Sequence, residues 1–453
     1  MGSNDPRQRP AATGRPTVVR RASALPLVPL LAALALPASP PVGAAYDDSS
    51  LRAICFNAER ASEMGEPLVL LAHKTVCDFA SYGPRTFDEH WVWFVADPRS
   101  TAADELRRFA VPLEVRYEQL FFDRCRIFRG ADTLSVDPHG FLLQPIDGWP
   151  EPGAFFFREV RAALPELRAG DIVEFAYRVS NRWSDRRAPS AWDAFPIRHP
   201  LAPTLERQII VAHNPVLKGR IRVIGDDRPP VRHMGVSPPR FELHTGDLPA
   251  GQADATGPGA ARMLFTASTN WWDVQRMLGF NYGPALLGAT QLFTSAGDSL
   301  SVRHRGSRER LAAVLAHVDR EWTPLPQSLT AASYYPSDAG ELNAQRVAGP
   351  LDRAMLVAGL ARAAHMQASL FLARTAAEPF LPDFAVPHQF DRLAVQVDLL
   401  EEGVKVLIDP LRGRLEDAVG AAEEYTHFLG CVPPWEGLYE RDASGALVPL
   451  ALE

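Results

Sequence analysis

The chain has 453 residues, more than one typical domain needs, and 46% hydrophobic with 22% charged residues is an ordinary globular composition. The net charge is −7, and no block of lysine and arginine follows the first 45 residues, which excludes the electrostatic footprint of a nucleic-acid-binding protein. We therefore expect two or three folded domains and no nucleic-acid partner.

Residues 1–45 have the pattern of a secretory signal peptide. Arg15, Arg20 and Arg21 precede the apolar run Leu25–Leu36, and the small residues of Val42–Ala45 supply a cleavage site. The run has about 12 residues, too few to span a bilayer as a mature helix. We expect a protein exported to the periplasm or the extracellular space, with no transmembrane segment in its mature part. Arg20 and Arg21 leave a twin-arginine signal as an alternative, although the flanking residues do not support it.

Export makes the four cysteines candidates for disulfides. They are Cys55, Cys77, Cys125 and Cys431. Two alternatives remain: a disulfide between two of the first three cysteines, or four free thiols that are buried. The spacings fit no zinc pattern, so we expect no metal site.

Residues 46–268 are expected to form one β-rich domain, because from about Gly65 to Ser268 the sequence has the period of two that is typical of strands. A large apolar residue stands at every second position in two stretches, at Val173, Phe175, Tyr177 and Val179 and again at Trp91 and Trp93. Further expected strands are Leu120–Phe128, Leu205–His213, Gly219–Gly225, Arg240–His244 and Arg262–Ala267. Many short strands separated by turns favour an antiparallel β-sandwich.

Three features of this half occur in a fixed order. Tyr117-Glu118 precedes a strand, the aromatic run Phe155–Phe157 follows, and then comes the hairpin sequence Leu164–Tyr177 with Leu-Pro and Gly-Asp-Ile-Val-Glu. The order resembles that of the β-rich domain of unknown function that precedes transglutaminase-like domains in many exported bacterial proteins. The resemblance implies that a second, transglutaminase-like domain follows.

Aromatic residues in the β-rich half have two interpretations. Trp91 and Trp93 lie at strand spacing and are expected in the core. Trp183 and Trp192 lie in the charged, proline-containing segment 181–200, where rings that line a binding face and rings that pack in the core are both open.

Helical patterns begin after residue 268. Trp271 opens a helical stretch that we expect to end near Tyr282, and Ser307 is the expected N-cap of an amphipathic helix. The stretch after Gly349-Pro350 is apolar nearly all round, which predicts a buried helix that begins at Pro350. The expected strands after it are Gln367–Arg374, Arg392–Leu400 and Val404–Ile408, and residues 416–453 are expected to form a packed tail.

The sequence around this buried helix resembles the start of the catalytic helix of bacterial transglutaminase-like proteins. The positions that match are Pro336, Glu341, Arg346, Asp352 and Arg353. The same alignment puts Pro350 where the family has its nucleophilic cysteine. Proline has no group that can act as a nucleophile.

The other two catalytic positions of the family are matched downstream. Phe390-Asp391-Arg392 resembles a Phe-Asn-His strand, and Ile408-Asp409-Pro410 resembles a strand that ends in Asp-Pro. Arg392 therefore occupies the place of the catalytic histidine, and only Asp409 keeps the family's residue type. The resemblance implies an α+β, papain-like domain over residues 269–415 that has lost the catalytic cysteine and histidine.

A two-residue hairpin between Leu400 and Gly403 would make the numbers of paired residues sum to 803. Asp409 would then face Ala394, with Arg392 as its diagonal neighbour on the same face. We expect an ion pair between Arg392 and Asp409 in place of the catalytic His–Asp pair.

These observations predict an exported, non-catalytic pseudoenzyme that acts as a binding or scaffold protein. Its expected partner is an envelope peptide, protein or glycan, and no cofactor is expected. The candidate binding residues are Asp352, Arg353, Arg392, Asp409, Trp183 and Trp192. The alternative is a hydrolase, transamidase or peptidase that acts on envelope peptides through relocated residues.

Overall fold

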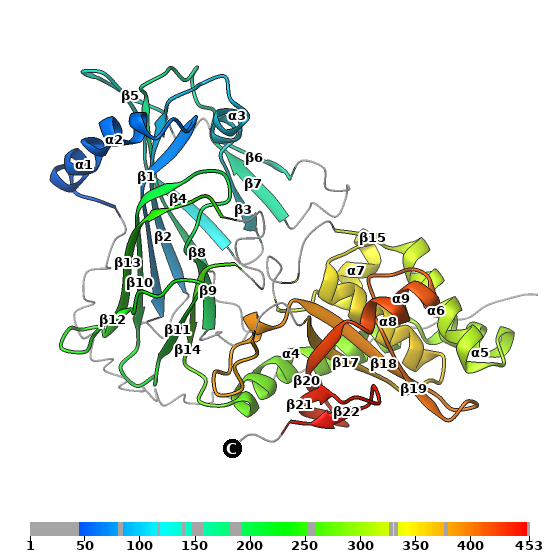
Figure 1. Cartoon of the computed structure of the whole chain (residues 1–453). Coiled ribbons are helices and arrows are strands. Elements are labelled where there is room, and N and C mark those ends of the chain that lie inside the picture. The colour runs from blue at the N-terminus through cyan, green and yellow to red at the C-terminus, as the bar shows by residue number, and fades with distance from the viewer. Residues whose placement is uncertain are drawn as a thin grey trace, which may run out of the picture. The chain divides into compact units, whose positions relative to one another are not determined.

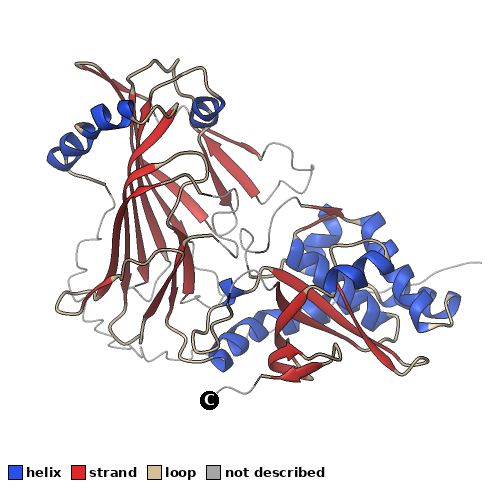
Figure 2. Cartoon of the chain, in the orientation of Figure 1, coloured by secondary structure: helices blue, strands red, loops and turns tan. Residues whose placement is uncertain are grey.

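The computed structural model describes residues 45–79, 85–115, 118–137, 141–146, 157–181, 192–251, 260–325, 329, 334–375 and 379–450. The expected signal peptide and Trp183 lie outside these residues. The fold is mixed α+β, with strands dominating up to Thr266 and most helices following Trp271 (Figures 1 and 2). In the described part of the chain, no helix is long and apolar enough to cross a membrane.

The largest sheet has eight strands in the order β12-β13-β10-β1-β2-β8-β4-β5. Their bounds are β1 Leu68–Phe79, β2 Thr86–Val95, β4 Glu118–Arg129, β5 Asp132–Ser135, β8 Ile172–Asn181, β10 Thr204–His213, β12 Val231–His233 and β13 Arg240–Leu248. β1 and β10 pair in parallel, whereas their other neighbours are antiparallel. The strands expected at Leu120–Phe128, Leu205–His213 and Arg240–His244 are confirmed.

Two three-stranded sheets accompany the eight-stranded sheet. One has the order β11-β14-β9 and the other β3-β7-β6. Their bounds are β3 Ala110–Glu114, β6 Leu142–Pro145, β7 Phe157–Arg161, β9 Trp192–Pro196, β11 Arg220–Ile224 and β14 Arg262–Thr266. Met263 and Phe265 of β14 share a buried apolar cluster with Ile209 and Val211 of β10. Because strand side chains alternate, one face of β14 covers one face of β10.

The helices follow the expected pattern only in part. Their bounds are α1 Asp48–Cys55, α2 Asn57–Glu63, α3 Thr101–Arg107, α4 Trp271–Leu292, α5 Thr294–Arg303, α6 Ser307–Glu321, α7 Ala339–Gln345, α8 Pro350–Ala363 and α9 Leu415–Ala422, with a 3₁₀ turn at Pro387–Gln389. α4 continues ten residues beyond the expected end at Tyr282. The N-cap expected at Ser307 is wrong, because Gly306 occupies that position and the Glu401 carboxylate accepts from the Ser307 backbone N–H.

α8 is the buried helix that the apolar pattern predicts, and it begins at Pro350. Two glycines let neighbouring helices approach its backbone. A Cβ added at Gly359 would lie 2.6 Å from the Ala289 Cβ of α4, and a Cβ at Gly297 of α5 would lie 2.3 Å from the Ala363 carbonyl carbon of α8. Such distances are far below van der Waals contact, so the packing of α8 depends on these missing side chains.

A six-stranded sheet in the order β19-β18-β17-β20-β21-β22 packs against α8. Its bounds are β17 Ala368–Thr375, β18 Arg392–Leu399, β19 Val404–Ile408, β20 Tyr425–Val432, β21 Trp435–Arg441 and β22 Leu447–Pro449, and β15 Thr323–Pro324 pairs with β16 Val347–Ala348 elsewhere. β20 pairs directly with β17. The segment expected as a packed tail therefore supplies half of this sheet.

Candidate functional site

The N-terminus of α8 holds the first of the three aligned catalytic positions. Gly349 is the N-cap and gives no side-chain cap, and Pro350 is the first helical residue and is buried. Proline fits this position because the N–H that it lacks would have no partner within the helix. The helix terminus at which the sequence resemblance expects a catalytic thiol therefore carries no thiol.

Two further aligned residues in the first turn of α8, Asp352 and Arg353, have structural partners. The Asp352 carboxylate accepts from the backbone N–H of Ser337 at 2.7 Å and from its hydroxyl at 3.0 Å. Arg353 is 1% exposed, and it donates to the Pro410 carbonyl at 3.0 Å and to the Asp319 carboxylate at 2.6 Å. The expected ligand contact by Arg353 is not supported, because a surface ligand cannot reach a side chain buried to this degree.

The strand register around Arg392 and Asp409 is as expected. Val395 pairs with Ile408 and Leu399 with Val404, so paired numbers sum to 803. The ion pair, however, is wrong. Arg392 contacts the Asp391 carboxylate at 3.1 Å and the Asp391 carbonyl at 3.0 Å.

Asp409 also finds its partners nearby in the sequence. One carboxylate oxygen accepts from the Leu411 N–H at 2.8 Å, and the other lies 3.7 Å from Nε of Arg412. Burial raises the pKa of Tyr425, and the charge of Asp409 and a hydrogen bond to it raise this pKa further. Within the described structure, no hydrogen bond or ion pair joins Arg392 to Asp409 or either of them to Pro350.

The aromatic candidates that the structure describes are packed in the interior. Trp192 is 2% exposed and belongs to the same apolar cluster as Trp271, so a binding role for Trp192 is not supported. Trp93 is buried, and Trp91 stacks on it with ring centroids 5.9 Å apart. The core interpretation of Trp91 and Trp93 agrees with this packing.

All four cysteines are free thiols, so the bridge left open among the first three is not formed. Burial raises the pKa of Cys125 to about 12 and raises those of Cys77 and Cys431 as well. A thiol needs a lowered pKa to be a nucleophile at neutral pH. None of the four is activated in that sense, since burial also raises the pKa of the half-buried Cys55.

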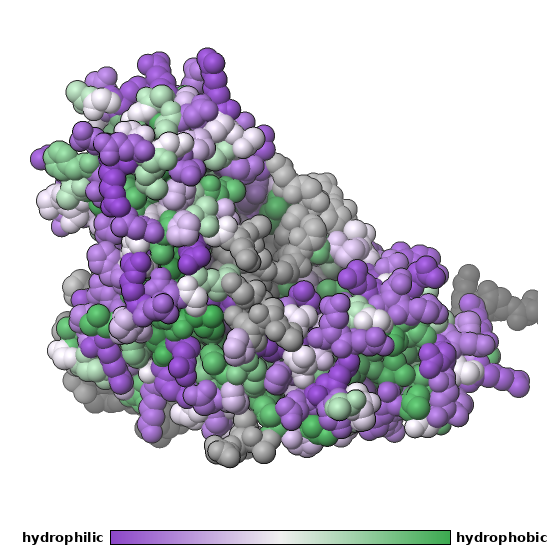
Figure 3. All heavy atoms as spheres, in the orientation of Figure 1, coloured by the Kyte–Doolittle hydropathy of each residue, from purple (hydrophilic) through white to green (hydrophobic). Residues whose placement is uncertain are grey.

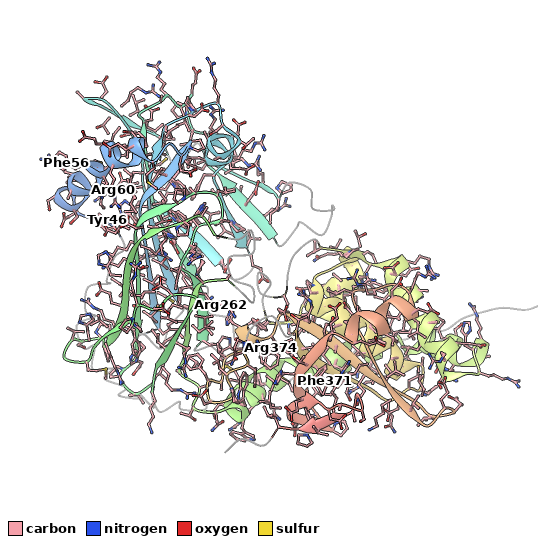
Figure 4. The ribbon with its side chains drawn as sticks, viewed as in Figure 1. Tyr46, Phe56, Arg60, Arg262, Phe371 and Arg374 are labelled. Carbon is pink, nitrogen blue, oxygen red and sulfur yellow. The ribbon has the colours of Figure 1, made fainter. Side chains whose placement is uncertain are left out.

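A buried polar group lies where β9 meets the 3₁₀ turn. His388 Nε2 is 3.8 Å from the Asp193 carboxylate, which also accepts from Arg85, and the Tyr334 ring meets the His388 ring edge to face at 5.2 Å. Burial lowers the pKa of His388 to about 4, with Arg85 and Arg262 (labelled in Figure 4) adding to the effect. His388 is therefore neutral at pH 7.

A second buried polar group lies on the eight-stranded sheet. His73 Nε2 is 2.6 Å from the Glu89 carboxylate, Thr75 donates to both Glu89 oxygens at 3.0 Å, and Arg207 donates to Thr75 at 2.9 Å. Burial raises the pKa of Glu89 to about 7 and lowers that of His73. Because these side chains satisfy one another, we interpret them as the polar centre that joins β1, β2 and β10.

Sequence reasoning missed both polar groups. A signal was present for the second one, since His73 and Thr75, and likewise Glu89 and Trp91, have the two-residue spacing that puts them on one face of a strand. The first group unites segments almost 200 residues apart, for which the sequence holds no local signal. Among the described residues, no group of three or more His, Cys, Asp or Glu side chains could hold a metal ion.

The lowered pKa of His388 predicts a stability that depends on pH. Its folded pKa of about 4 lies below the ordinary 6.5, so His388 binds more protons in the unfolded chain and its contribution to stability falls as the pH drops from 7 to 5. We expect this drop to cost about 2 kcal/mol through His388. Urea unfolding at pH 7 and pH 5 measures it.

The variant His388→Gln should show a pH-dependent loss that is smaller by about that amount. The exposed His365 provides the control His365→Gln, which should keep the wild-type slope. Glu89 acts in the opposite direction, because its raised pKa makes stability fall as the pH rises toward 7. An unchanged slope in His388→Gln would contradict the buried, neutral state of His388.

The sequence matches no family model and no curated protein. Among solved structures, a suspected protease from Parabacteroides distasonis is similar over 85% of this chain and 72% of its own, with a TM-score of 0.68 and 10% identity. An M1 zinc metallopeptidase from Deinococcus radiodurans aligns with 44% of this chain over 42% of its own length, at 11% identity. Its TM-score of 0.24 is too low to support an argument. The first similarity concerns the fold alone.

Proposed function

We propose that this protein is an exported, non-catalytic binding or scaffold protein, built from a β-sandwich followed by a papain-like, transglutaminase-like domain. The observation that carries the proposal is Pro350 at the first position of α8, where that family has its nucleophile. Arg392 at the histidine position contacts its own neighbour Asp391, and the partners of Asp409 in the described chain are Leu411, Arg412 and Tyr425 rather than a cysteine or histidine. The partner we expect is an envelope peptide, protein or glycan.

Export rests on the sequence of residues 1–45. Isolation of the protein from the envelope of its host, with a mass that lacks about the first 45 residues, would support this part of the proposal. A full-length chain that stays in the cytosol would remove it.

The alternative is a peptidase or transamidase that uses relocated groups. Two observations favour keeping it in view: the fold similarity to a suspected protease, and the buried His388 next to Asp193 and Tyr334. Against it stand the low pKa of His388 and the raised pKa values of the thiols. A general base works best when its pKa lies near the operating pH.

We expect the purified protein to show no turnover of a glutamine-donor peptide with an amine acceptor, and none of an unfolded protein substrate. Loss of a triad nucleophile lowers the rate constant roughly a millionfold. The assay follows product by mass spectrometry, before and after alkylation with iodoacetamide. Turnover that alkylation abolishes would refute the proposal, and turnover that only His388→Asn abolishes would establish the alternative.

A further inference from the structure

A cavity of about 330 Å³ opens at the edge of the β-rich half. It lies between β11, which supplies Arg220, Ile221 and Arg222, and the edge of the large sheet, which supplies Arg232 and Phe241. Asp383 and Phe384, from the loop before the 3₁₀ turn, complete its lining. Figure 3 shows hydrophilic and hydrophobic residues side by side over the face that carries β11 and β12.

The three arginines of this groove are not equally engaged. Arg220 donates to the carbonyls of Asp383 and Ser268, each at 2.8 Å, and so braces the loop against the strand. Arg222 lies 3.4 Å from the Asp383 carboxylate, but the two side chains are 47% and 73% exposed. An ion pair this exposed contributes little and exchanges readily for another carboxylate.

Arg232 has no carboxylate partner within 4 Å in the described structure. Its Nε donates to the Met234 sulfur at 2.9 Å, and its guanidinium lies over the buried Phe241 ring at 5.5 Å from the centroid. The ring holds the arginine in place while both terminal nitrogens stay available. The groove thus carries three positive charges against one negative charge.

Both strands that border the groove have an open edge. In the described chain β11 pairs only with β14, and β12 pairs only with β13. Val231 and Met234 beside Arg232 are 56% and 52% exposed. Unpaired strand edges, nearby exposed apolar side chains and an excess of arginine suit an extended peptide with acidic side chains.

We propose that this groove binds an extended acidic segment of a partner polypeptide, with its carboxylates on Arg222 and Arg232 and an apolar side chain against Phe384. The inference rests on the proposed binding function and moves its site from the former catalytic positions to β11 and β12. A small anion would contact only the arginine side chains and would leave the strand edges and the apolar walls without a partner. The strand edges and apolar walls favour a peptide.

The probe is a fluorescein-labelled octapeptide that alternates glutamate with valine, and the comparison peptide alternates lysine with valine. We expect the full chain to bind the acidic peptide at least about tenfold more tightly by fluorescence anisotropy, with affinity falling as salt rises. The double variant Arg222→Gln/Arg232→Gln should lose about tenfold or more in affinity. Asp383→Asn should bind more tightly, because it frees Arg222 and keeps the carbonyl that Arg220 contacts.

The exposed Arg303 and Arg305 give the matched control, because Arg303→Gln/Arg305→Gln removes the same two positive charges away from the groove and should leave the affinity unchanged. Equal affinity for both peptides, or no loss in the double variant, would overturn the proposal. So would complete displacement of the peptide by inorganic phosphate at low millimolar concentration, which would indicate a simple anion site. Cleavage of the bound peptide would refute the non-catalytic function and leave the groove intact, whereas absence of binding would refute only the groove.

Discussion

Replacing Arg207 by methionine should lower the free energy of unfolding by about 3–5 kcal/mol, the range for a buried charge network that loses one partner. Arg207 is 1% exposed, and its guanidinium donates to the carbonyls of His73, Gln208 and Pro196 at 2.9–3.2 Å and to the Thr75 hydroxyl. Methionine fills much of the volume but donates to none of these acceptors. Each acceptor left unpaired costs about 1–3 kcal/mol.

Glu89 provides the check on this mechanism. The positive charge of Arg207 lowers the pKa of Glu89 against the effect of burial, so its loss should raise that pKa above about 7. In the double variant Arg207→Met/Glu89→Gln, the loss in free energy of unfolding should be smaller than the sum of the two single losses. The glutamine has no negative charge that would be left without a partner when Arg207 is removed. Urea unfolding at pH 8 measures all four proteins of the cycle. Arg222→Met, an exposed arginine changed in the same way, should lose less than about 0.5 kcal/mol.

Gly359→Val should destabilise to a similar degree, and we expect it to fold poorly or to lose about 3 kcal/mol or more. A side chain at position 359 meets Ala289 of α4, whose Cβ would lie at 2.6 Å and whose carbonyl carbon at 2.9 Å. The obstacle includes backbone, so no rotamer change relieves it, and α4 must move away from α8. Thermal unfolding followed by circular dichroism measures the loss.

Two further variants separate crowding from helix propensity. Gly420 of α9 is exposed and has open space where a Cβ would be added, so Gly420→Ala should stabilise by about 0.5–1 kcal/mol, while Gly359→Ala should destabilise despite the same gain in propensity. The exchange Gly359→Ala/Ala289→Gly should recover part of the loss, because it removes the nearest atom. No recovery together with a mild effect of Gly359→Val would contradict the close approach of the two helices.

Much of the fold could be predicted because its signals are local. The alternation around Val173 predicts β8, and the apolar stretch after Gly349-Pro350 predicts α8. The Glu401-Glu402 turn even predicts the register of β18 on β19. In each case neighbours in the sequence decide the structure.

The site could not be predicted in the same way, because its partners are chosen in space. Arg392 and Asp409 share the expected register, yet Arg392 contacts Asp391, and Asp409 contacts Leu411 and Arg412 and has a hydrogen bond with Tyr425. The groove joins Arg222 and Arg232 to Asp383, which follows about 150 residues later. Only the two-residue spacing of Arg220 and Arg222, which places both on one face of a strand, was visible beforehand.

The parallel pairing of β1 with β10 has a consequence for how the chain folds as it is synthesised. His73 pairs with Arg207, 134 residues later, so one edge of β1 stays open until β10 has emerged. Contacts this distant in sequence form slowly. Until β1 pairs with β10, its open edge is rich in apolar residues and prone to aggregate. We infer that a chain truncated before residue 204 exposes Leu68–Phe79 as an unpaired, aggregation-prone strand edge. A chaperone that binds unpaired strands would then increase the yield most between the emergence of β1 and that of β10.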